Sequence, residues 1–259
     1  MASNKTNGPR IGRVLLSLSG LVLLLILWSV AIRFSTGTLL PGPLAVLNAI
    51  VEIAQKGFLV KHVVASLFRV TWGYLLAVVI GVPFGMFLGR LRRPEMAIAP
   101  LIEFLRPISP LAWIPIAILW FGVGNASPIY LIFIASVFPM IVQTTAGVHT
   151  IEKRYLRAAE NFGVPRQKLF LQVVFPATLP QIIVGMRIGL GVAWLVVVAA
   201  EMIALRSGLG YMIIDSRNAG NRYDLVVAGM IIIGLIGLAL DGIMRLLENM
   251  KIVRWRYAH

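Results

Sequence analysis

The chain has 259 residues, of which 59% are hydrophobic and only 13% are charged, and it contains no cysteine. A soluble domain is usually about one-quarter charged, so this composition excludes an ordinary soluble protein and predicts an all-α polytopic membrane protein. Without cysteine there is no disulfide, thiolate metal site or thiol nucleophile. The net charge is +14, but the basic residues flank apolar runs, as in cytoplasmic membrane loops, so we expect no nucleic-acid partner.

The N-terminal part predicts one membrane span followed by an interfacial helix. Lys5, Arg10 and Arg13 precede an apolar run over 14–32, which is long enough to cross the hydrocarbon core. The run is long for a signal peptide and no A-x-A cleavage site follows it, so we expect an uncleaved first span. A short amphipathic helix over 44–54 should then lie on the far side of the membrane.

Three further spans are predicted over 65–88, 97–121 and 128–148. In the first of these, three glycines repeat at four-residue spacing: Gly81, Gly85 and Gly89. Such a strip allows close helix packing, either inside the subunit or at a dimer seam. The next span carries four prolines: Pro100, Pro107, Pro110 and Pro115. Prolines free backbone carbonyls, which in a bilayer must face protein or water, so we expect an irregular helix that lines a pathway.

The C-terminal half predicts a charged segment over 149–180, a fifth span over 182–203, a polar segment over 205–224 and a sixth span over 225–246. With the N-terminus inside, fifteen Lys and Arg residues lie in the inner segments and six in the outer ones. This bias predicts that both termini and the charged segment are cytoplasmic. We divide the chain into an N-terminal part (1–60), a transmembrane domain (61–246) and a basic tail (247–259).

The charged segment begins with a short amphipathic helix. Thr150 is a candidate N-cap and Gly163 a candidate C′ residue that ends the helix, and Pro165 can begin a second one. One narrow face is apolar, because four residues recur at helical spacing: Tyr155, Ala158, Ala159 and Phe162. The pattern alone leaves two interpretations open, an interfacial loop helix or a docking element for a soluble partner.

The same segment resembles the EAA signature of binding-protein-dependent ABC importer permeases. The family pattern is EAA, three residues, Gly, nine residues, Ile, one residue, Leu-Pro. Four residues of the chain match it at that spacing: Ala158, Ala159, Gly163 and Pro176. Three depart from it: Arg157 stands for Glu, Val173 for Ile and Phe175 for Leu. The charge reversal at Arg157 puts in doubt any ion pair that the family's Glu would make.

The resemblance extends from about residue 40 to residue 246. The chain looks like the nitrate, sulfonate, taurine and bicarbonate branch of these permeases, and nearest to the taurine and alkanesulfonate members. Three stretches carry the likeness: LRPISPLAW at 105–113, RIGLG at 187–191 and WLVVVAAEMI at 194–203.

This resemblance implies a type I ABC importer permease fold, with six transmembrane helices and a cytoplasmic coupling helix, in the bilayer of a bacterial inner membrane. Two permease copies, expected to be a homodimer, would form the path. Two cytoplasmic ATPase subunits would bind ATP and Mg, and an extracytoplasmic binding protein would deliver a small oxyanion. An organosulfonate such as taurine is favoured over nitrate or bicarbonate. The implied coupling residues are Tyr155, Arg157, Ala158, Ala159, Phe162, Gly163, Val173 and Pro176.

Charged residues at membrane depth are candidates for the translocation pathway. With a neighbouring proline, the candidate set is Glu103, Arg106, Pro107, Arg187 and Glu201. Glu103 and Arg106 form a local i, i+3 pair or, alternatively, Arg106 attracts a passing anion. Arg187 either snorkels to headgroups or lines the path, and Glu201 is interfacial or pairs with a basic group as a gate residue. Asp241 is expected to pair with Arg245, one turn later, in preference to the alternative of a proton relay.

Other functional classes find less support in the sequence. The chain has no P-loop, no paired acids and no metal-ligand cluster, so we expect no catalytic residue, metal or cofactor of its own. An ion-coupled secondary transporter of small anions is the main alternative, but such folds often show inverted repeats, and none is visible here. A membrane enzyme would need acids, histidines or a nucleophile that converge near one interface, and the sequence shows no such cluster. A pure scaffold subunit would not need the charges at membrane depth or the proline-rich span.

Overall fold

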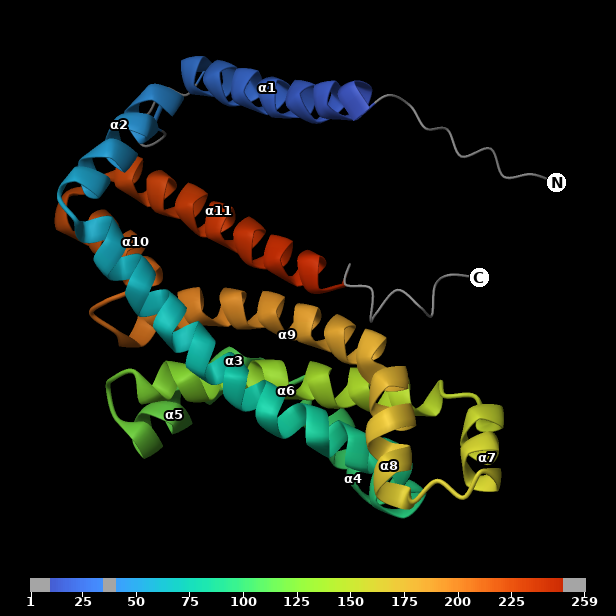
Figure 1. Cartoon of the computed structure of the whole chain (residues 1–259). Coiled ribbons are helices and arrows are strands. Elements are labelled where there is room, and N and C mark those ends of the chain that lie inside the picture. The colour runs from blue at the N-terminus through green and yellow to red at the C-terminus, as the bar shows by residue number, and fades with distance from the viewer. Residues whose placement is uncertain (1–9, 35–40, 249–259) are drawn as a thin grey trace.

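The computed structural model describes residues 10–34 and 41–248, and within them all regular structure is helical. In chain order the elements are α1 (Arg10–Phe34), α2 (Pro43–Gln55), α3 (Phe58–Arg90), α4 (Arg92–Leu105), η1 (Pro110–Trp113), α5 (Ile114–Phe121), α6 (Ala126–His149), α7 (Lys153–Asn161), α8 (Arg166–Leu169), η2 (Phe170–Val174), α9 (Phe175–Ala204), α10 (Leu209–Gly220) and α11 (Tyr223–Glu248). Figure 1 shows them as an elongated bundle. The all-α prediction is confirmed.

The core of the bundle is α6, which packs between α3 and α9. The glycine strip of α3 makes this contact close: a Cβ at Gly85 would lie 2.7 Å from the Cβ of Thr144 on α6. Gly185 of α9 faces α6 in the same way, since a Cβ there would lie 2.9 Å from the Cβ of Gln143. Of the two interpretations of these glycines, packing inside the subunit is therefore the one observed.

Four described helices are long and apolar enough to cross a membrane: α3, α6, the continuous helix over 167–203, and α11. The expected span over 97–121 is not one irregular helix. It is a pair, α4 and η1–α5, bent by 87° at a break of four residues. The break follows from the prolines, because Pro107 and Pro110 lack the N–H groups that would continue α4. α1 covers the expected first span, although the side chains at 10–18 lie outside the described residues.

The fifth span begins earlier than predicted. Helix α8, the π-helical segment η2 and α9 are continuous, so the span starts near residue 167 rather than at 182. The π segment ends two residues before Pro176, which is in the first turn of α9. A proline ring clashes with the carbonyl four residues earlier, and a widened turn removes that clash. The second half of the charged segment is thus part of a long helix and not a loop.

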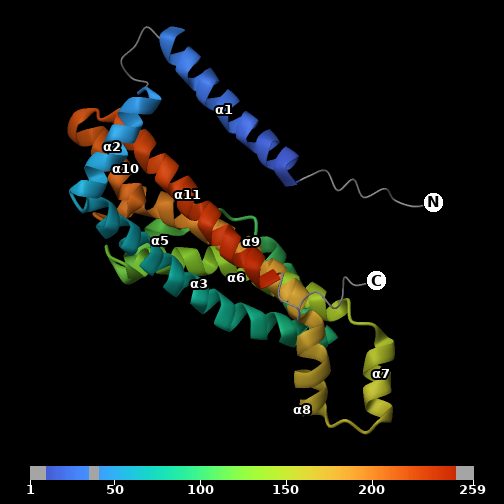
Figure 2. The same ribbon diagram turned by 45° about the horizontal axis from the view of Figure 1, so that its top comes forward.

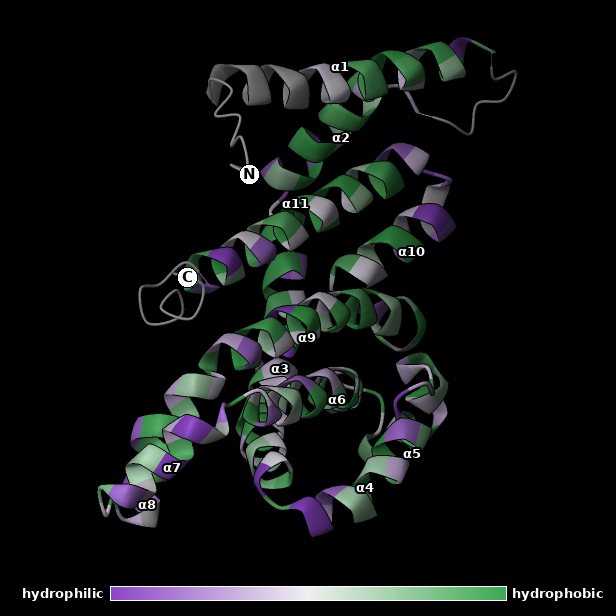
Figure 3. Ribbon diagram, turned by 90° about the vertical axis from the view of Figure 1, so that its right-hand side faces the viewer, coloured by the Kyte–Doolittle hydropathy of each residue, from purple (hydrophilic) through white to green (hydrophobic). Residues whose placement is uncertain are grey.

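The molecule has two unlike ends, which lie at opposite sides of Figures 1 and 2. We call the one that holds α2, α5 and α10 the α10 end, and the one that holds α7 and α8 the α7 end. Figure 3 shows hydrophobic residues along most of α3, α6, α9 and α11, and hydrophilic ones gathered on α7, α8 and the tips of the bundle. This distribution matches a bundle whose middle faces hydrocarbon and whose two ends face water.

Candidate functional site

Helix α7 projects from the bundle at the α7 end (Figures 1 and 2). Gly163, just after it, has φ +68°, and the Val164 N–H donates to the carbonyl of Ala159 at 3.1 Å. This is the left-handed C-terminal cap that the sequence predicts for Gly163. At the other end, α7 begins at Lys153, three residues after the predicted N-cap Thr150. Thr150 is the C-cap residue of α6, and its hydroxyl donates to the carbonyl of Gly147 at 2.8 Å.

The two sides of α7 differ in what they contact. Leu156 turns inward and packs against a cluster formed by Met86, Val174 and Ile182 of the long spans. On the other side, Phe162 is 86% exposed, Tyr155 is 46% exposed and Ala158 is also exposed. The helix is therefore attached to the spans through one apolar side chain and presents a second apolar face to its surroundings. Such an exposed patch on a projecting element is typical of a protein interaction site.

Arg157 and the more distant signature residues also have defined places. Arg157 is exposed, and no ion pair joins it to another described side chain. Neighbouring Arg154 instead pairs with Glu152 at 2.6 Å and stacks over the Tyr155 ring at 5.0 Å. Val173 and Pro176 lie in and just after the π segment, at the base of the fifth span. The signature therefore covers both the projecting helix and the start of the long helix over 167–203.

A buried ion pair lies at the α10 end, and only its acid, Glu201, is among the predicted pathway residues. Arg69 Nη1 of α3 lies 2.6 Å from Glu201 Oε1 of α9, with exposed side-chain fractions of 2% and 0%. The Ser66 hydroxyl lies 2.9 Å from Glu201 Oε1 and 2.8 Å from Oε2. Pairing with a basic group is what the gate interpretation of Glu201 requires, while gating itself stays a prediction. Arg69 was missed, although a lone arginine inside an apolar helix is a detectable signal.

The same cluster fixes the turn between α9 and α10. Arg69 Nη1 donates to the Ser207 carbonyl at 2.8 Å, and the Gly210 N–H donates to Glu201 Oε2 at 3.0 Å. His62 Nδ1 accepts from the Gly208 N–H at 3.1 Å. Gly208 has φ +111°, and a Cβ there would overlap the carboxylate of Glu201, so only glycine fits. Side chains of α3 and α9 thus bind the backbone of this turn through charge-assisted hydrogen bonds.

The other predicted pathway residues do not gather at one place. Glu103 and Arg106 are exposed at the end of α4, and no ion pair joins them in the described part of the chain, so the local-pair alternative is not observed. Pro107 lies at the 87° break. Arg187 lies fourteen residues before Glu201 on the same helix, about 21 Å away.

Arg187 is held by acids of α11. Its Nε donates to Asp241 Oδ1 at 2.7 Å and its Nη1 to Glu248 Oε2 at 3.1 Å. Arg187 therefore has ion-pair partners inside the subunit, on α11, which neither alternative for this residue had named. The predicted pair of Asp241 with Arg245 is present at 2.8 Å. Within the described residues no group of three or more His, Asp or Glu side chains could hold a metal ion.

Comparisons with known proteins agree with this arrangement. Residues 81–251 match the family described as binding-protein-dependent transport system inner membrane component. A putative ABC transporter permease of Methanocaldococcus jannaschii is 39% identical over 94% of this chain and 92% of its own. The taurine transport system permease TauC of Escherichia coli is 36% identical over 97% and 93%, and the bicarbonate permease CmpB of Synechococcus elongatus is 35% identical over 88% and 86%.

Solved structures show the same fold at lower identity. A bacterial alginate ABC transporter chain superposes with a TM-score of 0.66 at 15% identity, covering 94% of this chain and 97% of that chain. A chain of the MetNI methionine ABC transporter gives a TM-score of 0.59 at 19% identity, with coverages of 73% and 95%. The chain belongs to the family of binding-protein-dependent ABC importer inner-membrane permeases, in the branch that includes the taurine, sulfonate and bicarbonate permeases.

Proposed function

We propose that the chain is the membrane subunit of an ATP-driven importer that carries a small oxyanion, with an organosulfonate such as taurine as the favoured substrate. The observation that carries the proposal is α7: an apolar-faced helix that projects from one end of a membrane bundle and is attached through Leu156 to the base of its longest span. The 36% identical taurine permease supports the substrate class.

In this proposal the α7 end is cytoplasmic, and two ATPase subunits that bind ATP and Mg dock against the exposed residues of α7. Closure of the ATPases would move α7 as a rigid element, and the contact of Leu156 with Val174 and Ile182 would pass that movement to the fifth span. Both termini would lie in the cytoplasm, as the distribution of Lys and Arg predicts. Two copies of the chain would enclose the path.

At the opposite end an extracytoplasmic binding protein would deliver the anion to the surface formed around α10. The Arg69–Glu201 cluster would hold the turn before α10 in the closed position until binding-protein docking and ATP binding favour another arrangement. Arg106, exposed at the break of the bent pair and without an ion-pair partner among the described residues, would attract the anion in transit.

The experiment is reconstitution of the purified chain with a partner ATPase and a taurine-binding protein, followed by uptake of taurine into proteoliposomes. Ala158→Trp, on the exposed face of α7, should abolish ATP-driven uptake or release the ATPase, because a bulky side chain cannot enter a groove shaped for alanine. Gln172→Trp is the control, since Gln172 is exposed at the same end but lies on η2. Equal uptake by the two variants would contradict the docking role of α7.

A further inference from the structure

The first turn of α10 is held by side chains that belong to other helices. The first N–H groups of a helix have no acceptor within the helix, and the N-cap residue of α10 is Gly208, which has no side chain to supply one. Three consecutive N–H groups donate instead to side chains of α3 and α9: Gly208 to His62 Nδ1 at 3.1 Å, Leu209 to Ser66 Oγ at 2.9 Å and Gly210 to Glu201 Oε2 at 3.0 Å. His62 and Ser66 are one turn apart, so both acceptors lie on one face of α3.

His62 is the acceptor in this group whose side chain ordinarily titrates between about pH 5 and pH 8. Its Nδ1 accepts the Gly208 N–H only while it carries no proton, so the neutral ring holds its hydrogen on Nε2. Protonation turns both ring nitrogens into donors. The Nδ1–H would then face the Gly208 N–H, and the hydrogen bond would be lost.

The surroundings of His62 oppose a positive charge on the ring while it faces Gly208. His62 is 9% exposed and Gly208 is buried, so no water is at hand to replace the lost acceptor. The N-terminus of α10 also carries a partial positive charge. The charged or titratable groups near the ring come from α3, α9, α10 and the turn between the last two: Lys61, Arg69, Glu201, Arg206, Tyr211 and Asp215. Glu201 already pairs with Arg69 at 2.6 Å, which leaves Asp215 as the acid that a protonated ring could approach.

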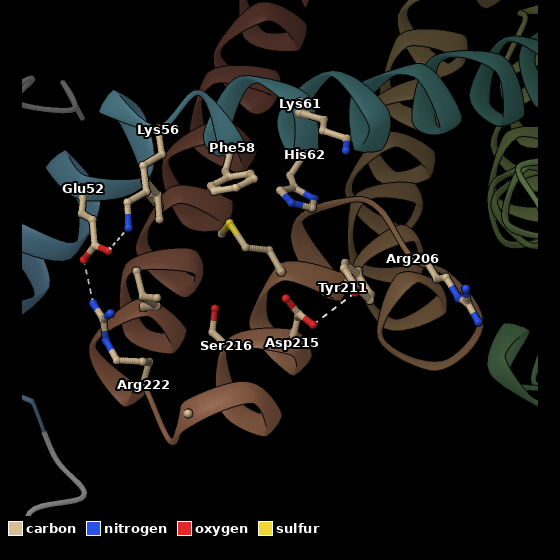
Figure 4. Close-up of a pocket in the computed structure, with 14 residues that line it drawn as sticks. Glu52, Lys56, Phe58, Lys61, His62, Arg206, Tyr211, Asp215, Ser216 and Arg222 are labelled. Atoms are coloured by element: carbon tan, nitrogen blue, oxygen red, sulfur yellow. Dashed lines mark hydrogen bonds and ion pairs between the residues drawn. The ribbon is translucent and has the colours of Figure 1, made fainter.

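A cavity of about 450 Å³ lies beside the ring, between α2, α3, α10 and the residues before α11 (Figure 4). Figure 4 shows the His62 ring pointing from α3 towards α10, where Asp215 lines the same cavity. Asp215 Oδ1 accepts the Tyr211 hydroxyl at 3.1 Å, and Oδ2 has no hydrogen-bond partner in the described part of the chain. At the far end of the cavity the charges pair with one another, Glu52 with Lys56 at 2.6 Å and with Arg222 at 2.7 Å. A protonated ring that leaves Gly208 therefore has space in which to turn and an acid to approach.

We propose that His62 is a proton-sensitive switch on the turn between α9 and α10. The neutral ring holds the Gly208 N–H, and the protonated ring releases it and turns towards Asp215. The release is local, because Arg69 still donates to the Ser207 carbonyl at 2.8 Å and the long spans keep their packing. This inference rests on the proposed function in one respect only, that the proton arrives from the extracytoplasmic side.

The test is hydrogen–deuterium exchange of the purified full chain in nanodiscs, without ATPase or binding protein, read by mass spectrometry of overlapping peptides that isolate the Gly208 amide. Each rate is divided by that of an unstructured peptide at the same pH, which gives the protection of this amide. We expect protection to be about tenfold lower at pH 5 than at pH 8, because the acceptor is lost.

Two variants separate His62 from every other group that titrates. In His62→Asn the amide oxygen lies as many bonds from the backbone as Nδ1 does and accepts without titrating, so protection should stay high at both pH values. His62→Phe keeps a ring beside Tyr211, where the two rings now lie 6.1 Å apart, but it has no acceptor, so protection should be low at both. His149→Asn is the control: His149 pairs with Glu95 at the α7 end, and its loss should leave the pH dependence of Gly208 unchanged.

A further variant tests the direction in which the ring turns. Asp215→Asn removes the acid that would receive the protonated ring, so the fall in protection should move to lower pH. The proposal is overturned if protection of Gly208 does not change between pH 8 and pH 5, or if His62→Asn shows the same change as the unmodified chain. An unmoved midpoint in Asp215→Asn overturns the turn towards that acid. No transport is measured, so these outcomes contradict the switch without contradicting the proposed function, and failed taurine uptake would do the reverse.

Discussion

Glu201→Gln removes the negative charge that faces Arg69 while keeping the shape of the side chain. The pair is almost completely buried, and Arg69 also donates to Asn125 Oδ1 at 2.9 Å and to the Ser207 hydroxyl at 2.6 Å. These neutral acceptors remain in the variant, but they do not compensate the guanidinium charge. The variant therefore leaves a buried cation without a counter-charge.

Breaking a buried ion pair by removing one partner costs about 3–5 kcal/mol. The amide oxygen of Gln can still accept one hydrogen bond, so we expect a value near the lower limit, about 3 kcal/mol. For a chain of this size that corresponds to a fall of roughly 6–12 °C in the unfolding midpoint. The loss should be smaller in Arg69→Met/Glu201→Met than the sum of the two single changes, because the double variant leaves no unpaired charge.

The assay is thermal unfolding of the purified chain in nanodiscs, with Glu103→Gln as the matched control. Glu103 is exposed and pairs with no described side chain, so its loss should change stability by less than about 0.5 kcal/mol. Equal midpoints for Glu201→Gln and Glu103→Gln would refute the argument that the cluster is desolvated and holds the turn before α10.

Three further predictions concern other parts of the molecule. Gly85→Ala should destabilise the bundle by about 1–3 kcal/mol in thermal unfolding, because its Cβ would overlap α6, whereas Gly242→Ala, with nothing within 4 Å, should not. Hydrogen bonds from Arg222 and Lys56 lower the pKa of Glu52 to about 2. The stabilising effect of Glu52 is therefore complete above about pH 4.5 and is lost as the pH falls toward 2. Glu52→Gln should make the unfolding midpoint less dependent on pH between about pH 4.5 and pH 2. Arg106→Gln should lower the rate of anion uptake about tenfold at low substrate concentration. Arg93→Gln, which changes an exposed arginine at the start of α4, away from the break, should not.

Each of these predictions has an outcome that contradicts it. Equal unfolding midpoints for the two glycine variants would mean that α3 and α6 are not in close contact. An unchanged pH profile in Glu52→Gln would mean that the pairs between α2 and α11 do not form in solution. Equal uptake by the two arginine variants would remove Arg106 from the pathway.

Local patterns in the sequence were enough to predict the long apolar helices α3, α6 and α11, and the short helix α7 with its C-terminal cap at Gly163. Gly163 and the apolar residues of α7 are encoded within one short segment, and the four-residue glycine spacing of α3 identifies a packing strip without reference to its partner. The prolines after residue 100 indicated that the helix there is irregular. They did not give the 87° bend, because that angle depends on packing against α6.

The buried cluster could not be predicted in the same way. Arg69 and Glu201 are 132 residues apart, and their contact depends on the relative register of α3 and α9, which no local pattern encodes. Arg187 illustrates the same limit: its position near a membrane surface suggested headgroups, whereas its partners lie more than fifty residues away on α11. In both cases a charged residue at membrane depth could be recognised in the sequence. Its partner could be identified only from the three-dimensional structure.

The central claim is that this membrane bundle is driven by ATPase subunits that dock on α7. The most direct measurement compares taurine uptake into two kinds of proteoliposome. The first contains the chain with a partner ATPase and binding protein, and the second contains the chain alone under an imposed proton or sodium gradient. We predict uptake only in the first, dependent on ATP on the α7 side and absent in Ala158→Trp. Gradient-driven uptake by the chain alone would contradict the account and identify a secondary transporter.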